Sequence, residues 1–301
     1  MSQKLKVGVL YGGLSSEREV SINTGTQISK NLNRDKYEVF EILVDNKKDV
    51  FKCEGLDFVF IALHGSFGED GQVQSILDAL GIKYNGCDFF TSSICMNKKM
   101  VKDILNNYDV KMSKGELLKK GNCDLENLNL NFPVIVKPNS GGSSVGVSIC
   151  KNKKELLKNL EMAFIYDDKI LVEEFVDGQE ITCGILNGQA LPIFKITPTN
   201  GEFFNYECKY DNTTIEELAK FDLKLDEEIK RQALKIYDIL CCKVYARVDF
   251  IVKEDIPYFL EINTLPGMTE GSLFPKIARE VGMNFKTLIE EIITSSFNCT
   301  K

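Results

Sequence analysis

Residues 245–269 read YARVDFIVKEDIPYFLEINTLPGMT and predict two β-strands joined by a short acidic turn. Arg247 and Asp249 lie two residues apart, so their side chains share one face of the first strand. Glu261 and Asn263 share a face of the second strand in the same way. The alternate positions are apolar and would face a core: Val248, Phe250, Leu260 and Ile262. One face of this hairpin therefore carries a cation, two carboxylates and an amide.

Two interpretations of this polar face stay open. Carboxylate and amide oxygens suit Mg²⁺, which takes one or two carboxylates together with substrate phosphates. The same side chains would also suit the wet face of a half-buried hairpin. The turn that follows, residues 264–269, favours a ligand site. Pro266 is stiff and Gly267 is permissive, so backbone N–H groups can approach a ligand closely there.

Size, charge and cysteine use limit the class of protein. The chain has 301 residues, enough for two or three domains. Its net charge of −7 argues against a non-specific nucleic-acid binder, which needs a basic field. No apolar run is long enough to span a bilayer, and the N-terminus has no signal-peptide pattern. Ten cysteines without a CxxC pair, and the single histidine His64, indicate reduced thiols in a cytoplasmic protein without a zinc site.

The first part of the chain predicts an α/β unit with a parallel sheet. Strands are expected at 7–10, 37–44, 58–63 and 82–85, with helices between the first two and the last two. The turn after the first strand holds Gly12 and Gly13, and Ser16 with Glu19 fits a capping box for the helix that follows. Glu17, at this helix start, is either a ligand contact or a favourable partner of the helix dipole. Glycine-rich loops at the carboxyl ends of strands, including residues 64–71, are expected to bind a ligand.

A second, smaller unit follows, with a helix expected from Thr91 to about Asn106. Its lysines, Lys98, Lys99 and Lys102, are individually better explained as solvated side chains than as ligand contacts. A strand over 131–138 delivers Lys137 to the loop NSGGSSVG at 139–146, which could fold over phosphates or form only a mobile polar tip. A further strand over 170–176 ends with Glu173 and Glu174. The backbone around Glu174 to Val176 could bond an adenine edge, or the segment could be only an acidic strand end.

The third unit precedes and includes the opening hairpin. We expect a hairpin at 181–196 around Asn187-Gly188, and a strand-like run at 203–210 that ends in Lys209-Tyr210. Residues 211–223 are polar and predict a loop that could move over the site. Asp226 is expected to cap the next helix, and Asn284 to cap the last one.

Eight motifs, taken together and in order, resemble the ATP-grasp superfamily and, within it, the D-alanine–D-alanine ligases. They are GGLSSEREVS (12–21), HGSFGEDG (64–71), CMNKKM (95–100), VIVKPNSGGSSVGVS (134–148), LVEEFVDGQE (171–180), KY (209–210), ARVDF (246–250) and EINTLPGMTEGSLFP (261–275). The resemblance covers nearly the whole chain. It implies a three-domain α/β architecture: a parallel-sheet domain at 1–92, a small α+β central domain at 93–178 and an α+β catalytic domain at 179–301.

The resemblance also implies roles for individual residues. For ATP it implies Lys98 and Lys137 at the phosphates, Glu173, Glu174 and Val176 at the adenine, Glu180 at the ribose and Lys209 at the γ-phosphate. For two Mg²⁺ (or Mn²⁺) ions it implies Asp249, Glu261 and Asn263. For catalysis it implies a lid of Glu17, Ser143 and Tyr210, with Glu17 also at the ammonium of the first D-alanine, and an oxyanion site of Arg247 and the Gly267 N–H. For the substrates it implies His64 near the first D-alanine, and Ser272 and Leu273 at the carboxylate of the second.

The implied reaction is ATP-dependent ligation of two D-alanine molecules through an acyl phosphate, in peptidoglycan precursor synthesis. The family also implies a homodimer. Two alternatives stay open. One is a ligase of the same fold that uses D-serine or D-lactate as second substrate, although the Lys209-Tyr210 pair resembles the D-alanine-using group. The other is a non-catalytic ATP-binding module, which would be expected to lack the metal ligands or Arg247.

Overall fold

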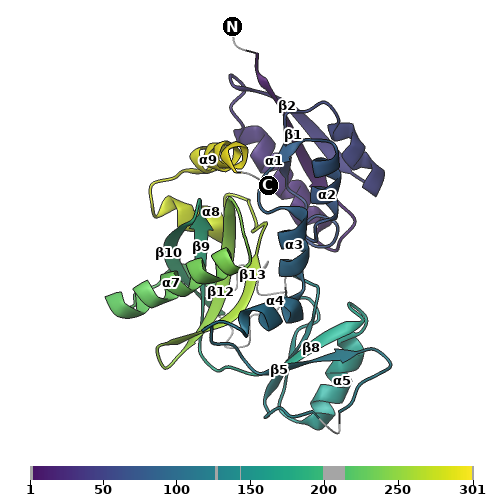
Figure 1. The fold of residues 1–301 in the computed structure, drawn as a ribbon, viewed down its shortest axis with the longest axis vertical. Coiled ribbons are helices and arrows are strands. Elements are labelled where there is room, and N and C mark those ends of the chain that lie inside the picture. The colour runs from purple at the N-terminus through teal and green to yellow at the C-terminus, as the bar shows by residue number, and fades with distance from the viewer. Residues whose placement is uncertain (1–2, 126–127, 143, 199–213, 300–301) are drawn as a thin grey trace.

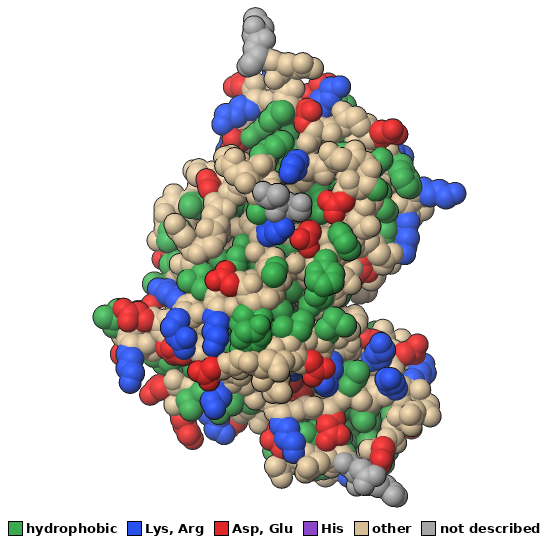
Figure 2. All heavy atoms as spheres, in the orientation of Figure 1, with side chains coloured by type: hydrophobic (Ala, Val, Ile, Leu, Met, Phe, Trp, Pro, Cys, Tyr) green, Lys and Arg blue, Asp and Glu red, His purple; other side chains and the backbone are tan. Residues whose placement is uncertain are grey.

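The protein is described from a computed structural model that covers residues 3–125, 128–142, 144–198 and 214–299. It contains three sheets, each built from a separate part of the chain (Figure 1). The part rich in parallel strands lies at one end of the molecule and the small central unit at the other. On the face drawn in Figure 2, basic and acidic side chains intermingle over all three parts.

The N-terminal sheet is parallel, with strand order β2-β1-β3-β4. Its elements are β1 (Leu5–Gly12), α1 (Arg18–Asn31), β2 (Tyr37–Val44), the 3₁₀ helix η1 (Lys47–Cys53), β3 (Phe58–Ile61), α2 (Gln72–Ala79) and β4 (Lys83–Tyr84). Parallel strands bring the loops that follow them to one edge of the sheet. The loops after β1 and β3, which hold the glycine-rich motifs, therefore meet at that edge.

The central unit is a small antiparallel sheet of order β5-β8-β6-β7 with one helix packed on it. Its elements are α3 (Phe89–Met96), α4 (Lys98–Leu105), β5 (Gly115–Lys119), β6 (Val134–Pro138), β7 (Ser148–Cys150), α5 (Lys153–Ala163) and β8 (Lys169–Glu174). Leu156 and Leu160 of α5 pack on one face of the sheet, against Val134, Val136 and Val172. The opposite face, with Lys137 and Glu173, is turned away from this core.

The third sheet is antiparallel, with order β11-β10-β9-β12-β13. Its elements are β9 (Gln179–Leu186), β10 (Gln189–Pro198), β11 (Thr214–Leu218), α7 (Leu223–Ile239), β12 (Tyr245–Lys253), β13 (Ile256–Asn263), α8 (Leu273–Arg279) and α9 (Phe285–Asn298). Helix α7 covers the face that carries Val248, Phe250 and Ile262. These three side chains are thus buried as predicted, and the polar side of the hairpin faces the other way. The prediction for Leu260 was wrong: a register shift between β12 and β13 places Phe259 in the core instead, and Leu260 lines a small cavity.

The last two helices complete the core of the N-terminal unit. One continuous cluster joins Val9 and Phe58 of the parallel sheet to Phe274 of α8 and to Leu288 and Ile292 of α9. Phe58 of β3 also contacts Phe297 of α9, with 5.6 Å between ring centroids. The first and last parts of the chain therefore share one hydrophobic core.

The mixed α/β class with a parallel N-terminal sheet is confirmed, whereas several local details differ. Ser16 does not cap α1: this helix begins at Arg18 after Glu17, which makes no side-chain cap. The helix expected over 91–106 is broken, because the Asn97 side chain accepts from the Met100 N–H and starts α4 anew. Asp222, not Asp226, caps α7 by accepting from the Leu225 N–H.

Other differences concern strands. The expected loop at 211–223 contains β11, which pairs with β10. Neither β5 nor η1 was expected from the sequence. The strand-like run expected at 203–210 lies outside the described residues.

Candidate active site

A cavity of about 490 Å³ lies where the N-terminal and C-terminal units meet. It brings together most of the residues that the sequence singles out for substrate and metal: Glu17, His64, Glu180, Arg247, Asp249, Glu261, Asn263, Gly267, Ser272 and Leu273. These residues come from the loops after β1 and β3, the polar face of the β9-β12-β13 sheet, and the turn into α8. Parts of the chain far apart in sequence therefore share one cavity.

The register of the β12–β13 hairpin builds the charged wall of this cavity. Arg247 pairs across the strands with Asn263, and Asp249 pairs with Glu261, so all four side chains share one face. The Arg247 guanidinium donates two hydrogen bonds to Asp249, from Nε to Oδ1 at 3.0 Å and from a terminal nitrogen to Oδ2 at 2.9 Å. Asp249 also accepts from Thr182 Oγ1 at 2.6 Å and from Asn263 Nδ2 at 3.1 Å.

Arg247 is held as a buried cation. Burial opposes its charge, but Asp249, Glu261 and Glu180 outweigh that effect and raise its pKa above the usual value. A guanidinium with two bonds to one carboxylate is also fixed in orientation. The cavity thus contains a permanent, oriented positive charge beside two carboxylates.

The donor set on this wall fits a divalent cation. Asp249, Glu261 and Asn263 offer two carboxylates and an amide oxygen on adjacent strands. Mg²⁺ favours such oxygen ligands and completes its shell with waters and substrate phosphates. Within the part of the chain that the structure describes, no group of three or more His, Cys, Asp and Glu side chains is arranged as a metal site.

A second, small cavity of about 50 Å³ adjoins the first on the side of the central unit. Glu180 and Glu261 line both cavities, and Lys98 and Lys137 line the small one. Lys98 Nζ lies 3.1 Å from Glu261 Oε2 and donates to the Gly141 carbonyl at 2.6 Å. This side chain therefore links the carboxylate wall to the glycine-rich loop, for which a fold over phosphates was one of the two interpretations of the sequence.

Glu173 is buried between two lysines, and the burial of one of them, Lys102, contradicts our expectation. Its carboxylate forms ion pairs with Lys137 on one oxygen and Lys102 on the other. Burial alone would raise the pKa of Glu173, but Lys137 and Lys102 together lower it to about 2. Lys102 was expected to be a solvated helix lysine, and this was wrong: only 7% of the residue is exposed.

The other two residues assigned to the adenine are less enclosed. The Glu174 side chain accepts from the backbone and side-chain amide groups of Asn131, at 2.9 and 2.8 Å. Its backbone N–H donates to the Lys114 carbonyl at 2.8 Å, so the structure engages both its side chain and its amide within the central unit. Val176 follows β8 and is half-buried.

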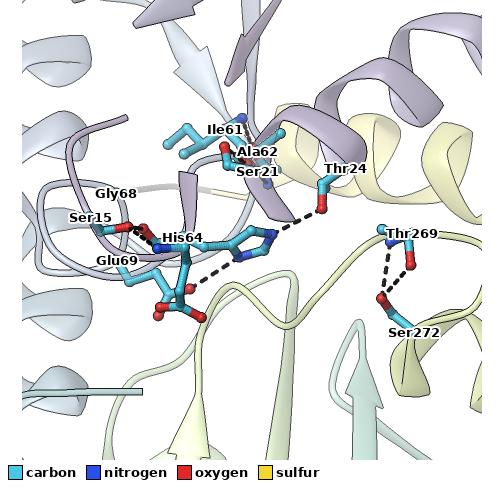
Figure 3. Close-up of polar contacts among 12 residues, drawn as sticks. Ser15, Ser21, Thr24, Ile61, Ala62, His64, Gly68, Glu69, Thr269 and Ser272 are labelled. Carbon is cyan, nitrogen blue, oxygen red and sulfur yellow. Dashed lines mark hydrogen bonds and ion pairs between the residues drawn. The ribbon is translucent and has the colours of Figure 1, made fainter. Parts of the chain in front are cut away.

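His64 anchors the N-terminal side of the large cavity (Figure 3). Its Nε2 lies 3.0 Å from Thr24 Oγ1 of α1, and its Nδ1 lies 3.3 Å from Glu69 Oε1. Burial raises the pKa of Glu69, with a further contribution from the Glu17 charge, while His64 acts in the opposite direction. The Glu17 carboxylate lies against Gly65, where an added Cβ would come within 2.8 Å of Oε2. Two acidic groups and an imidazole are therefore packed beside the space for a substrate.

The turn into α8 forms the remaining wall (Figure 3). Ser272 Oγ accepts from the Thr269 N–H at 3.2 Å and lies 2.8 Å from Thr269 Oγ1. Its hydroxyl is used within the turn and does not cap α8, which begins at Leu273. Gly267 lies beside Ser272: a Cβ added at Gly267 would lie 3.2 Å from the Ser272 hydroxyl oxygen. The N-terminus of a helix favours an anionic group.

Some expected residues cannot be placed, and some residues at the site were not expected. Ser143, Lys209 and Tyr210 lie outside the described residues. Glu69 and Thr182 were not assigned a role from the sequence. Glu69 stands within the quoted HGSFGEDG motif, so the signal was present, whereas Thr182 meets Asp249 only through the pairing of β9 with β12.

Comparison with known proteins identifies the family. The family model described as "D-ala D-ala ligase C-terminus" matches residues 105–294, and the one described as "D-ala D-ala ligase N-terminus" matches residues 6–54 and 45–87. The chain belongs to the D-alanine–D-alanine ligase family. A D-alanine–D-alanine ligase of Clostridium beijerinckii is 44% identical over 302 residues, which cover 99% of this chain and 100% of the relative.

Solved structures of this family share the fold. The crystal structure of D-alanine–D-alanine ligase from Bacillus anthracis complexed with ATP has a TM-score of 0.90 and 41% identity, with 98% of each chain covered. The VanG D-Ala:D-Ser ligase from Enterococcus faecalis has a TM-score of 0.85 and 27% identity, with 98% of this chain and 100% of that chain covered. The three-sheet architecture described above is therefore the architecture of the family.

Proposed function

We propose that the protein joins two D-alanine molecules to D-alanyl-D-alanine, with ATP converted to ADP and phosphate. The observation that carries the proposal is the cavity in which the Arg247, Asp249, Glu261 and Asn263 wall faces Glu17 and His64 of the N-terminal unit. Family membership over the full chain supports the same reaction. We place this step in the synthesis of peptidoglycan precursors, and hence in cell wall formation and cell shape.

The chemistry requires activation of a poor electrophile. A carboxylate oxygen of the first D-alanine attacks the γ-phosphorus of ATP, ADP leaves, and an acyl phosphate forms. The amine of the second D-alanine then attacks the acyl carbon, loses a proton, and phosphate leaves. Enzymes promote phosphoryl transfer mainly by positioning and by charge neutralisation. The fixed cation of Arg247 suits the oxyanion of the second step, together with the Gly267 N–H.

The substrates would occupy opposite ends of the large cavity. Glu17 and His64 line the end formed by the N-terminal unit, where a carboxylate can orient the ammonium group of the first D-alanine. Ser272 and Leu273 begin α8 at the other end, where the helix N-terminus can hold the carboxylate of the second. Ser143 and Tyr210 are proposed to form a lid with Glu17, on family resemblance alone.

The small cavity would take the phosphates of ATP. Lys98 and Lys137 line it and supply positive charge, and Lys209 is proposed to contact the γ-phosphate. Glu180 lines both cavities and would hold the ribose, with Glu173, Glu174 and Val176 around the adenine. Asp249, Glu261 and Asn263 would hold two Mg²⁺ or Mn²⁺ ions. Such ions neutralise phosphate charge when bound.

The first experiment is phosphate release by the protein with ATP, Mg²⁺ and D-alanine, and with L-alanine as control. We expect release with D-alanine only, accompanied by one D-alanyl-D-alanine per phosphate. Phosphate release without a dipeptide would contradict ligation. Absence of release from a protein that still binds ATP would support a non-catalytic ATP-binding module.

A second candidate is a ligase that uses D-serine or D-lactate as second substrate. The structural similarity to the VanG D-Ala:D-Ser ligase is the observation that favours it. Mixed incubations of D-alanine with each acceptor, with products separated by mass, distinguish the candidates. A single acceptor pocket discriminates modestly between similar groups, so the ratio of kcat/KM values is the quantity to compare.

The cellular setting is also a proposal. No helix in the described ranges is long and apolar enough to cross a membrane. We place the protein in the cytoplasm as a homodimer, without nucleic-acid or membrane partners. Light scattering during size-exclusion chromatography measures the oligomeric state directly, and a monomer at micromolar concentration would contradict the dimer.

A further inference from the structure

The buried cluster around Glu173 contains a lysine and a serine that the proposed reaction does not use. Lys102 of α4 pairs with Glu173 Oε1 and donates to Ser113 Oγ at 3.0 Å. Ser113 Oγ in turn donates to Glu173 Oε1 at 3.0 Å. Lys137 pairs with Glu173 Oε2. The Lys102 and Lys137 side chains are 9% and 5% exposed, and that of Glu173 is 1% exposed.

The hydrogen bonds on Glu173 are shared unequally between its two carboxylate oxygens. A carboxylate offers about four acceptor positions. Lys102 and Ser113 take two positions on Oε1, and Lys137 takes one on Oε2. Among the described residues, Oε2 therefore has fewer donors than Oε1, and its partner Lys137 lines the small cavity, whereas Glu173 itself is buried behind it. Three donors fix the orientation of the carboxylate.

The charge of Lys102 affects how strongly Lys137 can attract a phosphate group. Two ammonium groups and one carboxylate give the cluster a net charge of +1 (2 − 1). Without Lys102, Lys137 and Glu173 would form a neutral pair. A lysine fully compensated by a buried carboxylate attracts phosphate far less than one that shares the carboxylate with a second lysine. Lys102 thus keeps positive charge available at the small cavity, although it does not line that cavity itself.

Helix α4 connects this cluster to the other end of the nucleotide site. Lys98 and Lys102 lie four residues apart and so occupy one face of the helix, about 6 Å apart along its axis. Lys98 reaches Glu261 and the Gly141 carbonyl, while Lys102 reaches Glu173. One rigid helix therefore sets the spacing between the carboxylate wall and Glu173.

We propose that Lys102 is a positioning residue for the nucleotide: it orients Glu173 and leaves Lys137 free to bind phosphate. This inference rests on the proposed function, because it assigns Glu173 and Lys137 to ATP. It predicts that removal of the Lys102 charge weakens ATP binding while the steps after binding stay largely intact.

The test compares Lys102→Met with the matched control Lys99→Met. Lys99 is the neighbouring lysine of α4, and it pairs with Asp103, whose side chain is 61% exposed. Lys102→Met should weaken ATP binding, measured by calorimetry, on the order of tenfold. The KM for ATP should rise in parallel, with kcat and the KM for D-alanine near their original values. Lys99→Met should leave all of these unchanged.

A double-mutant cycle separates positioning from a structural role. If Lys102 acts through Glu173, then Lys102→Met costs less ATP affinity in a Glu173→Gln background than in the original protein. Equal losses in both backgrounds, or a lower Tm with unchanged ATP affinity, would overturn the proposal. If Lys102→Met does not fold, Ser113→Ala decides: weaker ATP binding at an unchanged Tm supports the proposal, and unchanged ATP binding overturns it.

The same variants show whether the ligase proposal or only the role of Lys102 is wrong. Wild-type protein and Lys99→Met must both release phosphate with D-alanine. If neither does, the ligase proposal fails. If both do and Lys102→Met binds ATP normally, only the role of Lys102 fails.

Discussion

Replacement of Arg247 by alanine is the perturbation that tests the charged wall most directly. The guanidinium donates to both oxygens of Asp249, at 3.0 and 2.9 Å, and Asp249 is only 3% exposed. Arg247→Ala leaves Asp249 with the Thr182 hydroxyl and the Asn263 amide as donors, but removes the cation that pairs with it. We therefore expect a loss of stability as well as a loss of activity.

Two independent estimates give the loss of stability expected for Arg247→Ala. Opposite charges about 4 Å apart, at the effective dielectric constant of about 20 that describes most protein sites, attract by about 4 kcal/mol. Removal of one partner from a buried ion pair costs about 3–5 kcal/mol in other proteins. The two values agree. For turnover, loss of a single oxyanion donor lowers kcat by about 10²–10³-fold.

The matched control is Arg231→Ala. Arg231 also donates two bonds to one carboxylate, from Nε and a terminal nitrogen to Glu228 at 2.8 and 2.7 Å. However, the two side chains are 55% and 38% exposed. Exposed pairs contribute about 0–1 kcal/mol. Denaturant unfolding measures stability, phosphate release measures kcat, and calorimetry measures ATP binding for both variants.

Two results would contradict the roles given to Arg247. If Arg247→Ala and Arg231→Ala unfold at the same denaturant concentration, burial does not strengthen the Arg247 pair. If Arg247→Ala turns over like the original protein, Arg247 has no role in either chemical step.

Substitutions of Glu261, Thr182 and Glu173 test three other parts of the site. Glu261→Gln should weaken Mg²⁺-dependent ATP binding, whereas Glu217→Gln, at an exposed pair on β11, should not; an unchanged Mg²⁺ titration would remove Glu261 from the metal site. Thr182→Val keeps the shape but removes the 2.6 Å hydrogen bond to Asp249, so unfolding should become easier by about 1.5–3 kcal/mol, and a loss near zero would mean that water replaces the hydroxyl. The pKa of Glu173 is lowered to about 2, so in the acid range the unfolded state binds more protons and stability falls as the pH drops from about 4.3 toward 2. Glu173→Gln should flatten the dependence of Tm on pH in that window, and an unchanged slope would show that other carboxyl groups cause it.

Local patterns predict much of the fold. The alternation in residues 245–263 predicted both strands and most of the buried face, because a strand between a core and a cavity must alternate. It failed at Leu260, because the register of the two strands shifts there and buries Phe259 instead. The parallel N-terminal sheet followed from apolar strands separated by helices. Its glycine-rich turns then placed His64 and Glu17 at one edge.

Contacts between distant segments were not predictable in this way. The burial of Lys102 depends on Glu173, which lies on β8, far from α4 along the chain, and a helix lysine offers no local signal of such a partner. Asn97 reads as an ordinary helix residue until its side chain is seen to accept from the Met100 N–H. The roles assigned to all the individual site residues stay predictions, and Ser143, Lys209 and Tyr210 lie outside the described residues.

The shared core of the first and last parts of the chain has a consequence for synthesis on the ribosome. The parallel sheet is complete in sequence at Tyr84, but Leu288 and Ile292 of α9 cover part of its core. About 200 residues separate them, and at about 5–20 residues per second their translation takes roughly 10–40 seconds. During that interval the nascent N-terminal unit exposes the apolar surface that α9 later covers. This surface is where a chaperone would bind a chain still being made.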